Sequence, residues 1–112
     1  MKMKISEHEF RIIDASTFGK RLVGLMGKKE LQKDEAMRLM PCSSIHTCFM
    51  KFAIDVVFLD KKNKVVDTIK SLPPWKFNAY SKSAYQVVEM AVGAIERAGI
   101  KKNMVAKFED LS

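Results

Sequence analysis

The chain has few of the residues that mark secreted, membrane or disulfide-rich proteins. Its 112 residues include only two cysteines, and no apolar run approaches the roughly twenty residues that a membrane-spanning helix needs. The N-terminal segment has two lysines but no apolar stretch of a signal peptide after them. We therefore expect a cytoplasmic protein without a membrane span, in which both cysteines are reduced thiols rather than a structural disulfide.

The sequence motifs of common enzyme classes are also absent. There is no glycine-rich phosphate loop, no serine in a nucleophile elbow, and no pair of carboxylates spaced for acid and base roles. We expect no cofactor. These absences favour a binding or accessory function over catalysis.

The overall composition is that of one globular domain covering residues 1–112. Apolar residues make up 47% of the chain and charged residues 29%, a balance far from that of disordered proteins. The formal net charge of +7 raises the question of an anionic partner such as nucleic acid. However, the lysines occur largely as separated pairs beside turn signals, at positions 28–29, 61–62 and 101–102. This distribution favours solvated turns over a specific nucleic-acid-binding groove.

Short β-branched and apolar runs alternate with turn signals along the chain. They predict strands at 10–14, 36–40, 54–60, 65–70, 85–90 and 104–108, with helices at 16–27 and 92–98. Asn63 suits the tight turn of a hairpin between the third and fourth of these strands. Most connections are too short for parallel crossovers. The predicted fold is therefore mainly β (α+β): a compact, largely antiparallel, β-barrel-like domain with one or two short helices.

The segment 72–84 is predicted to be a long loop, because it contains two adjacent prolines and little apolar periodicity. Aromatic and basic side chains gather in and just after it, namely Trp75, Lys76, Phe77, Tyr80, Lys82 and Tyr85. Such a mixture can stack on a sugar, base or peptide and neutralise an acid. The loop can equally fold over the open end of a barrel as a plug, and we favour this second interpretation.

The stretch from Cys42 to Cys48 raises three alternatives. If it is extended, Cys42, His46 and Cys48 share one face and are candidate metal ligands, although this requires a sharp turn at residues 43–44. A thiol nucleophile with His46 as its base and Asp55 as the orienting carboxylate is the second alternative. Along one strand, His46 and Cys48 would be about 7 Å apart, which is too long for a hydrogen bond. The third alternative is the entrance to a buried strand, with His46 at the edge of the core.

Asp55 lies in the strongly apolar run IDVVFLD. A carboxylate removed from water needs a partner, and the candidates are Arg21, Lys51 or free amides at the early helix. We prefer a pair between Asp55 and Arg21. Asp60, at the end of the run, is more simply a turn residue.

Four segments carry a resemblance to a known family: RLVGLMG (21–27), HTCFMKFAIDVVFLD (46–60), LPPW (72–75) and VVEMAVGAIERAGI (87–100). Together they resemble the DUF192 family, a set of small bacterial and archaeal domains of unknown function. The resemblance extends from about residue 16 to residue 108. It implies a compact, mainly β domain and brings no catalytic residue, cofactor or substrate.

Two main hypotheses of function follow. The first is a non-enzymatic binding or accessory domain that presents the Trp75 loop and the His46 edge to a small ligand or a protein partner. Its candidate ligand-binding residues are His46, Asp55, Arg21, Lys51, Trp75 and Tyr80. The second is a small hydrolase-like enzyme or metalloprotein centred on Cys42, His46, Cys48 and Asp55. A third alternative is nonspecific binding to nucleic acid or anionic membrane through net charge.

Overall fold

The computed structural model describes residues 1–14, 31–48 and 50–110. In this part of the chain there are nine strands and one short helix, α2 (Ala94–Ala98). The strands are β1 (Lys2–Ile5), β2 (His8–Asp14), β3 (Glu35–Leu39), β4 (Ser44–Ile45), β5 (Ile54–Leu59), β6 (Val65–Leu72), β7 (Ala79–Tyr80), β8 (Gln86–Ala91) and β9 (Lys107–Glu109). Seven of them form one sheet in the order β6-β5-β8-β3-β2-β1-β9, and β4 pairs with β7 in a separate ribbon.

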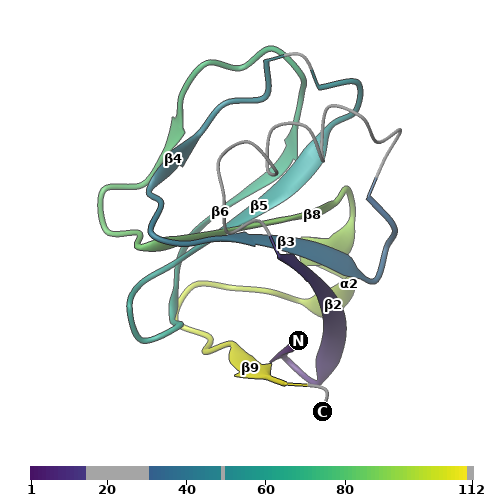
Figure 1. The fold of residues 1–112 in the computed structure, drawn as a ribbon, viewed down its shortest axis with the longest axis vertical. Coiled ribbons are helices and arrows are strands. Elements are labelled where there is room, and N and C mark those ends of the chain that lie inside the picture. The colour runs from purple at the N-terminus through teal and green to yellow at the C-terminus, as the bar shows by residue number, and fades with distance from the viewer. Residues whose placement is uncertain (15–30, 49, 111–112) are drawn as a thin grey trace.

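The seven-stranded sheet curls into a half-barrel, with β4 at one end of the molecule and β9 at the other (Figure 1). Its two edge strands approach each other at a single bridge between Lys64 and Val105. Beside the bridge, Val65 donates its backbone N–H to Met104, and Ala106 donates to Asn63, both at 2.8 Å. The radius of gyration of 12.6 Å is close to the value of about 13 Å for one domain of this length.

Side chains alternate along the central strands and build two apolar cores on opposite faces of the sheet. In β5, Val57 and Leu59 join the core that also holds Ala94 and Ile95 of α2. Val56 and Phe58 join the other core, which lies against Ile45 of β4 and Ala79 of β7. All six residues of β5 are buried because both faces of this strand are covered.

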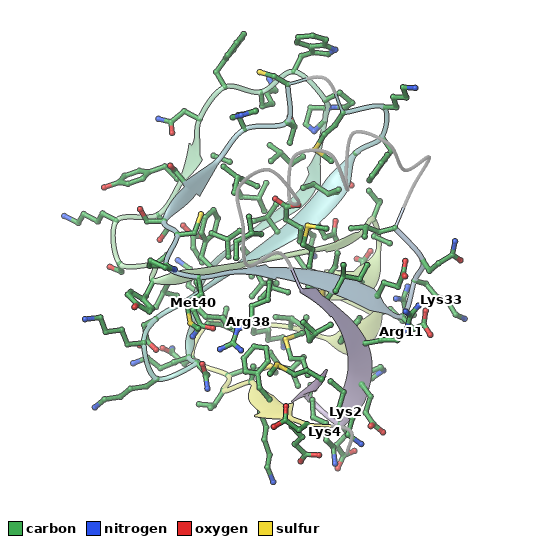
Figure 2. The ribbon with its side chains drawn as sticks, viewed as in Figure 1. Lys2, Lys4, Arg11, Lys33, Arg38 and Met40 are labelled. Carbon is green, nitrogen blue, oxygen red and sulfur yellow. The ribbon has the colours of Figure 1, made fainter. Side chains whose placement is uncertain are left out.

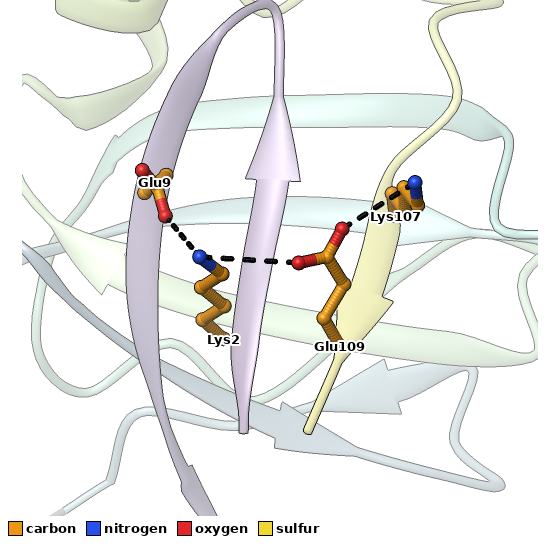
Figure 3. A network of polar contacts seen from close by, with 4 residues as sticks. All are labelled: Lys2, Glu9, Lys107 and Glu109. Atoms are coloured by element: carbon orange, nitrogen blue, oxygen red, sulfur yellow. Dashed lines mark ion pairs between the residues drawn. The ribbon is translucent and has the colours of Figure 1, made fainter. Parts of the chain in front are cut away.

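Ion pairs connect the strands beside the N-terminus, in the region where Figure 2 labels Lys2 and Lys4 of β1. Lys2 of β1 lies between two carboxylates of its neighbouring strands, 2.7 Å from Glu9 and 3.9 Å from Glu109 (Figure 3). Glu109 also pairs with Lys107 at 3.4 Å. These side chains are partly or largely exposed, so water screens each pair and its contribution to stability is small.

The predicted fold class is confirmed, and the hairpin is confirmed in detail. Asn63 has a φ of 66°, and Gly99, which ends α2, has a φ of 65°. Asn63 therefore has the left-handed conformation that its predicted turn requires, and Gly99 has the same conformation where α2 ends.

Some strands differ from the prediction. β1, β4 and β7 were not expected, and the last strand begins at Lys107 rather than at Met104. The pairing of β2 with β3 is parallel, which the residues between them allow because they are numerous enough for a crossover. The helix predicted at 16–27 lies outside the described residues. No helix found in the described ranges is long and apolar enough to cross a membrane.

Candidate functional site

Thr47 joins the two segments that the sequence marks as functional candidates. Its hydroxyl donates to the Pro73 carbonyl at 2.7 Å and accepts from the Lys76 amide at 2.9 Å. Its backbone N–H donates to the Lys76 carbonyl at 2.9 Å, and its carbonyl accepts from the Trp75 amide at 3.0 Å. Thr47 is fully buried. The His46 segment and the Trp75 loop are therefore held side by side by one buried residue.

The β4–β7 ribbon fixes the far side of the same loop. Ser44 pairs with Tyr80 and Ile45 with Ala79, and the Ser81 amide donates to the Ser43 carbonyl at 3.0 Å. Ile45 and Ala79 turn into the core, while Ser44 and Tyr80 are exposed. The segment predicted to be a loop is thus attached to the rest of the fold at both ends by backbone hydrogen bonds.

Three aromatic side chains of this loop stand out from the surface, and we call Trp75, Phe77 and Tyr80 the aromatic edge. Their exposed fractions are 54%, 79% and 54%. The preferred interpretation of the loop as a plug is therefore wrong for these three rings. The core beneath them is filled instead by aliphatic side chains, among them Ile45, Met50 and Leu72. Tyr85, the fourth aromatic residue, is partly buried, and the Lys61 ammonium lies over its ring, 5.1 Å from the ring centre.

The two cysteines and His46 do not form a cluster of ligands. The Cys42 thiol donates to the Ser44 carbonyl at 3.0 Å, and the Cys48 sulfur lies 4.0 Å from the Lys76 carbonyl. Nowhere in the described part of the chain do three His, Cys, Asp or Glu side chains gather as metal ligands. In the described part of the chain, the proposed set Cys42, His46 and Cys48 is thus not assembled as a metal site.

His46 contacts the backbone of Cys48. Its Nδ1 accepts from the backbone N–H of Cys48 at 3.3 Å, which places the proton of the neutral ring on Nε2. Cys48 is only 8% exposed, and the two cysteines are not joined in a disulfide. Apart from this contact, His46 is exposed, so the prediction of an imidazole at the edge of the core describes it best.

The side chain of Asp55 is buried and binds backbone amides. Its Oδ1 accepts from the Ser71 amide at 2.9 Å, and its Oδ2 accepts from the amides of Gly93 and Ile95, at 3.1 and 3.0 Å, where α2 begins. The carboxylate is 1% exposed. One of the predicted alternatives was that Asp55 binds backbone amides at the start of a helix. It does so, but the helix is α2 and not the one predicted at 16–27. Arg21, the preferred partner, lies outside the described residues.

Of the predicted ligand-binding residues, the structure brings His46, Trp75 and Tyr80 to one end of the molecule through the Thr47 contacts and the β4–β7 ribbon. Lys51 is exposed a few residues beyond His46, whereas Asp55 is buried under α2. Thr47 was missed by the sequence analysis. Its only signal is position, between His46 and Cys48, and nothing in a sequence shows that a threonine faces a loop some thirty residues away.

These features define the chain as a small half-barrel domain with a hydrogen-bonded aromatic edge. The DUF192 family model (Uncharacterized ACR) matches residues 1–108, and the chain belongs to this family. A UPF0127 protein of Pyrococcus furiosus is 35% identical over 92 residues, 78% of this chain and 77% of that protein. Another, from Pyrococcus horikoshii, is 34% identical over 109 residues, which are 93% of this chain and 85% of that protein.

A solved structure shares the fold. The crystal structure of a protein of unknown function from Novosphingobium aromaticivorans superimposes with a TM-score of 0.84 at 21% identity, covering 96% of this chain and 84% of that one. At this identity the likeness concerns the fold alone. The family resemblance seen in the sequence is therefore confirmed, and it brings a fold without an assigned activity.

Proposed function

We propose that the chain is a non-enzymatic binding domain whose aromatic edge holds an acidic segment of a partner protein. The observation that carries this proposal is the exposure of Trp75, Phe77 and Tyr80. These three residues lie in one stretch of six residues whose backbone is held by hydrogen bonds. Large aromatic side chains exposed together are costly in water and are typical of the centres of protein interfaces. Because Thr47 already orders the backbone of this loop, binding loses less conformational entropy there.

Charge supports an acidic partner. The two segments that form this end of the molecule, 41–54 and 71–88, contain Lys51, Lys76 and Lys82 but neither aspartate nor glutamate. All three lysines are exposed. Ammonium groups beside aromatic rings attract carboxylates and speed the encounter with an acidic surface.

The exposure of the rings favours a protein segment over a small ligand. A small molecule is normally enclosed by the aromatic side chains that bind it, whereas rings that protrude insert into a partner's own surface. Phe77, at 79% exposed, is the clearest example.

A hydrolase-like or metal-dependent activity of Cys42, His46, Cys48 and Asp55 has less support. The Asp55 carboxylate is occupied by three backbone amides, and His46 accepts from an amide rather than from a thiol. A catalytic group needs a reacting atom within hydrogen-bond reach, and these contacts direct the groups elsewhere.

The cytoplasm is the compartment that we propose for this domain. The two cysteines are thiols and not a disulfide, which supports this compartment, since a reducing environment keeps cysteines in this form. Titration of thiols in protein isolated without reductant tests this directly: two reactive thiols per unfolded chain are expected, and a disulfide would contradict it.

Trp75 is the single tryptophan of the chain, so its fluorescence reports on the proposed site without a label. Synthetic peptides that combine Asp or Glu with Leu or Phe are titrated into the protein, beside matched peptides in which Lys replaces the acidic residues. We expect the acidic peptides to shift the Trp75 emission to shorter wavelength in a saturable manner, and the basic peptides to leave it unchanged.

Two substitutions make the test specific. Phe77→Ser should weaken binding of the acidic peptide by about tenfold or more. Val105→Ser is the matched control, because Val105 is also exposed, at 61%, but lies beside β9 at the other end of the half-barrel. Equal losses in both variants, or equal binding of acidic and basic peptides, would contradict the proposal.

A further inference from the structure

The half-barrel carries a hollow between the β5–β6 turn and the residues that precede β8, and no residue of the aromatic edge lines it. It has a volume of about 460 Å³ and is lined by Asp60, Lys61, Lys62, Lys64, Ser83 and Tyr85, among others. We call it the lysine–tyrosine pocket. A volume of this size lies within the range of small-molecule sites, about 300–1,000 Å³.

We propose that the lysine–tyrosine pocket binds a phosphate monoester of a small organic molecule, with the phosphate among the lysines and the organic part against the Tyr85 ring. The proposal does not depend on the aromatic edge. It rests on three properties of the pocket: an ordered backbone, an excess of positive charge and an aromatic wall.

The backbone of the pocket is ordered by its own hydrogen bonds. The Asp60 Oδ1 accepts from the amides of Lys62 and Lys64 at 2.8 and 3.0 Å, and the Asn63 amide donates to the Asp60 carbonyl at 3.1 Å. The turn that carries the lysines is thus held by its own hydrogen bonds before any ligand arrives, which lowers the entropy lost on binding.

A buried glutamine connects this turn to the opposite wall. Gln86 is 1% exposed, and its Nε2 donates to the Asp60 carbonyl at 2.9 Å and to the Asn63 side chain at 2.6 Å. Its Oε1 accepts from Arg38 at 2.8 Å. The adjacent Tyr85 donates its amide to the Leu59 carbonyl at 2.8 Å. Both walls are therefore attached to the same buried side chain and to the end of β5.

The charge of the pocket is positive. Lys61, Lys62 and Lys64 are exposed, and within the described ranges none of them forms an ion pair. Asp60 is the single carboxylate of the lining, and its Oδ1 is already bound by two amides. Three ammonium groups against one carboxylate leave an excess of charge that a phosphate monoester, with about two negative charges at neutral pH, would neutralise.

Tyr85 supplies a surface for the organic part. The Lys61 ammonium lies 5.1 Å from the centre of the Tyr85 ring, so a charge and an aromatic ring border the same space. Ser83 adds a hydroxyl to the wall. An ordinary solvated turn would need neither the facing ring nor the buried glutamine that holds the two walls together.

Calorimetric titration with phenyl phosphate, in about 0.15 M salt to screen weak surface attraction, tests the proposal. We expect one molecule to bind per chain, and inorganic phosphate to bind more weakly to the same site. The double variant Lys61→Gln with Lys64→Gln should weaken phenyl phosphate binding by about tenfold or more. Lys4→Gln is the matched control for lost charge. Lys4 is exposed on β1, near the N-terminus, and is labelled in Figure 2. Its substitution should change the affinity for phenyl phosphate by no more than about twofold.

Tyr85→Leu separates the ring from the charges. It should weaken phenyl phosphate but leave inorganic phosphate unchanged, provided the far-ultraviolet circular dichroism and melting temperature show an intact fold. The proposal is overturned if phenyl phosphate does not saturate a site, or if Lys4→Gln weakens binding as much as the double variant. Binding of a single-stranded oligonucleotide that phenyl phosphate cannot displace would also overturn it.

Discussion

Two buried polar residues, Asp55 and Thr47, each hold a neighbouring segment by accepting backbone N–H groups, but the segments they hold differ. Asp55 receives the amides at the start of α2 and the amide of Ser71, and the helix that it fixes is packed into the core. Thr47 fixes residues 73–76, and the ring that follows on Phe77 points into solvent.

The difference shows that the same kind of contact stabilises the fold at Asp55, whereas at Thr47 it holds exposed aromatic side chains in position. Around Asp55, apolar surface is removed from water, so the ordered segment contributes to folding. Around Thr47, aromatic surface is left in water, so ordering the loop adds little to stability beyond its hydrogen bonds. Substitutions at the two residues should therefore separate folding from binding.

The largest effect is expected at Asp55. Replacing Asp55 with alanine removes a buried carboxylate and leaves the amides of Ser71, Gly93 and Ile95 without this acceptor, so we expect the free energy of unfolding to fall by about 3–5 kcal/mol. Urea denaturation measures it. Asp55→Asn, which keeps one acceptor oxygen, should lose clearly less. A loss below about 1 kcal/mol in the alanine variant would show that these bonds are not important for folding.

A smaller effect is expected at Thr47. Thr47→Val keeps the shape of the side chain but removes the hydroxyl bonded to Pro73 and Lys76, so the free energy of unfolding should fall by about 1–2 kcal/mol. Binding of the acidic peptide, followed by Trp75 fluorescence, should weaken because the loop loses two of the hydrogen bonds that order it. Thr47→Ser retains the hydroxyl and is the control. If Thr47→Val binds as the wild type does, the loop needs no such support.

The smallest effect concerns Asp60, a partly exposed carboxylate that, like Asp55, accepts hydrogen bonds from backbone amides. The backbone hydrogen bond from Lys64, with the one from Lys62 and the charges of both lysines, lowers the pKa of Asp60 below its ordinary value of 3.8. A lowered pKa means that the folded state favours the charged form. The stabilisation is therefore complete above the ordinary pKa and is lost as the pH falls through the lowered one.

Comparison with Asp60→Asn isolates this contribution. The wild type should be slightly more stable than the variant at neutral pH, and urea denaturation should show the difference shrinking in the acid range. The same difference at all pH values would mean that the charge of Asp60 has no part in holding the turn.

Much of the fold could be predicted from local patterns. The β5–β6 hairpin followed from two apolar runs with Asn63 between them, and α2 lies within the helix predicted at 92–98. β1 was missed because KMKI is short and half of it is lysine. β4 and β7 were missed because each has two residues and pairs only with the other.

The candidate site could be predicted only in part. His46, Trp75 and Tyr80 were chosen by residue type, and the structure brings them to the same end of the molecule. The exposure of Trp75, Phe77 and Tyr80 was not predicted, because a sequence does not tell whether aromatic side chains of a loop face the core or solvent. The role of Gln86 beneath the β5–β6 turn was missed because a sequence likewise does not tell whether a glutamine side chain faces the interior or solvent.

By itself, the sequence determined the strand periods, the turn residues and the family, because these depend on neighbours along the chain or on shared motifs. Tertiary structure alone decided which polar groups are buried and what they bind: Thr47 meets residues 73–76, and Asp55 meets α2 about forty residues later. Such pairings come from the curl of the sheet, which brings distant segments together, and a buried polar group is stable only where that curl supplies its partner.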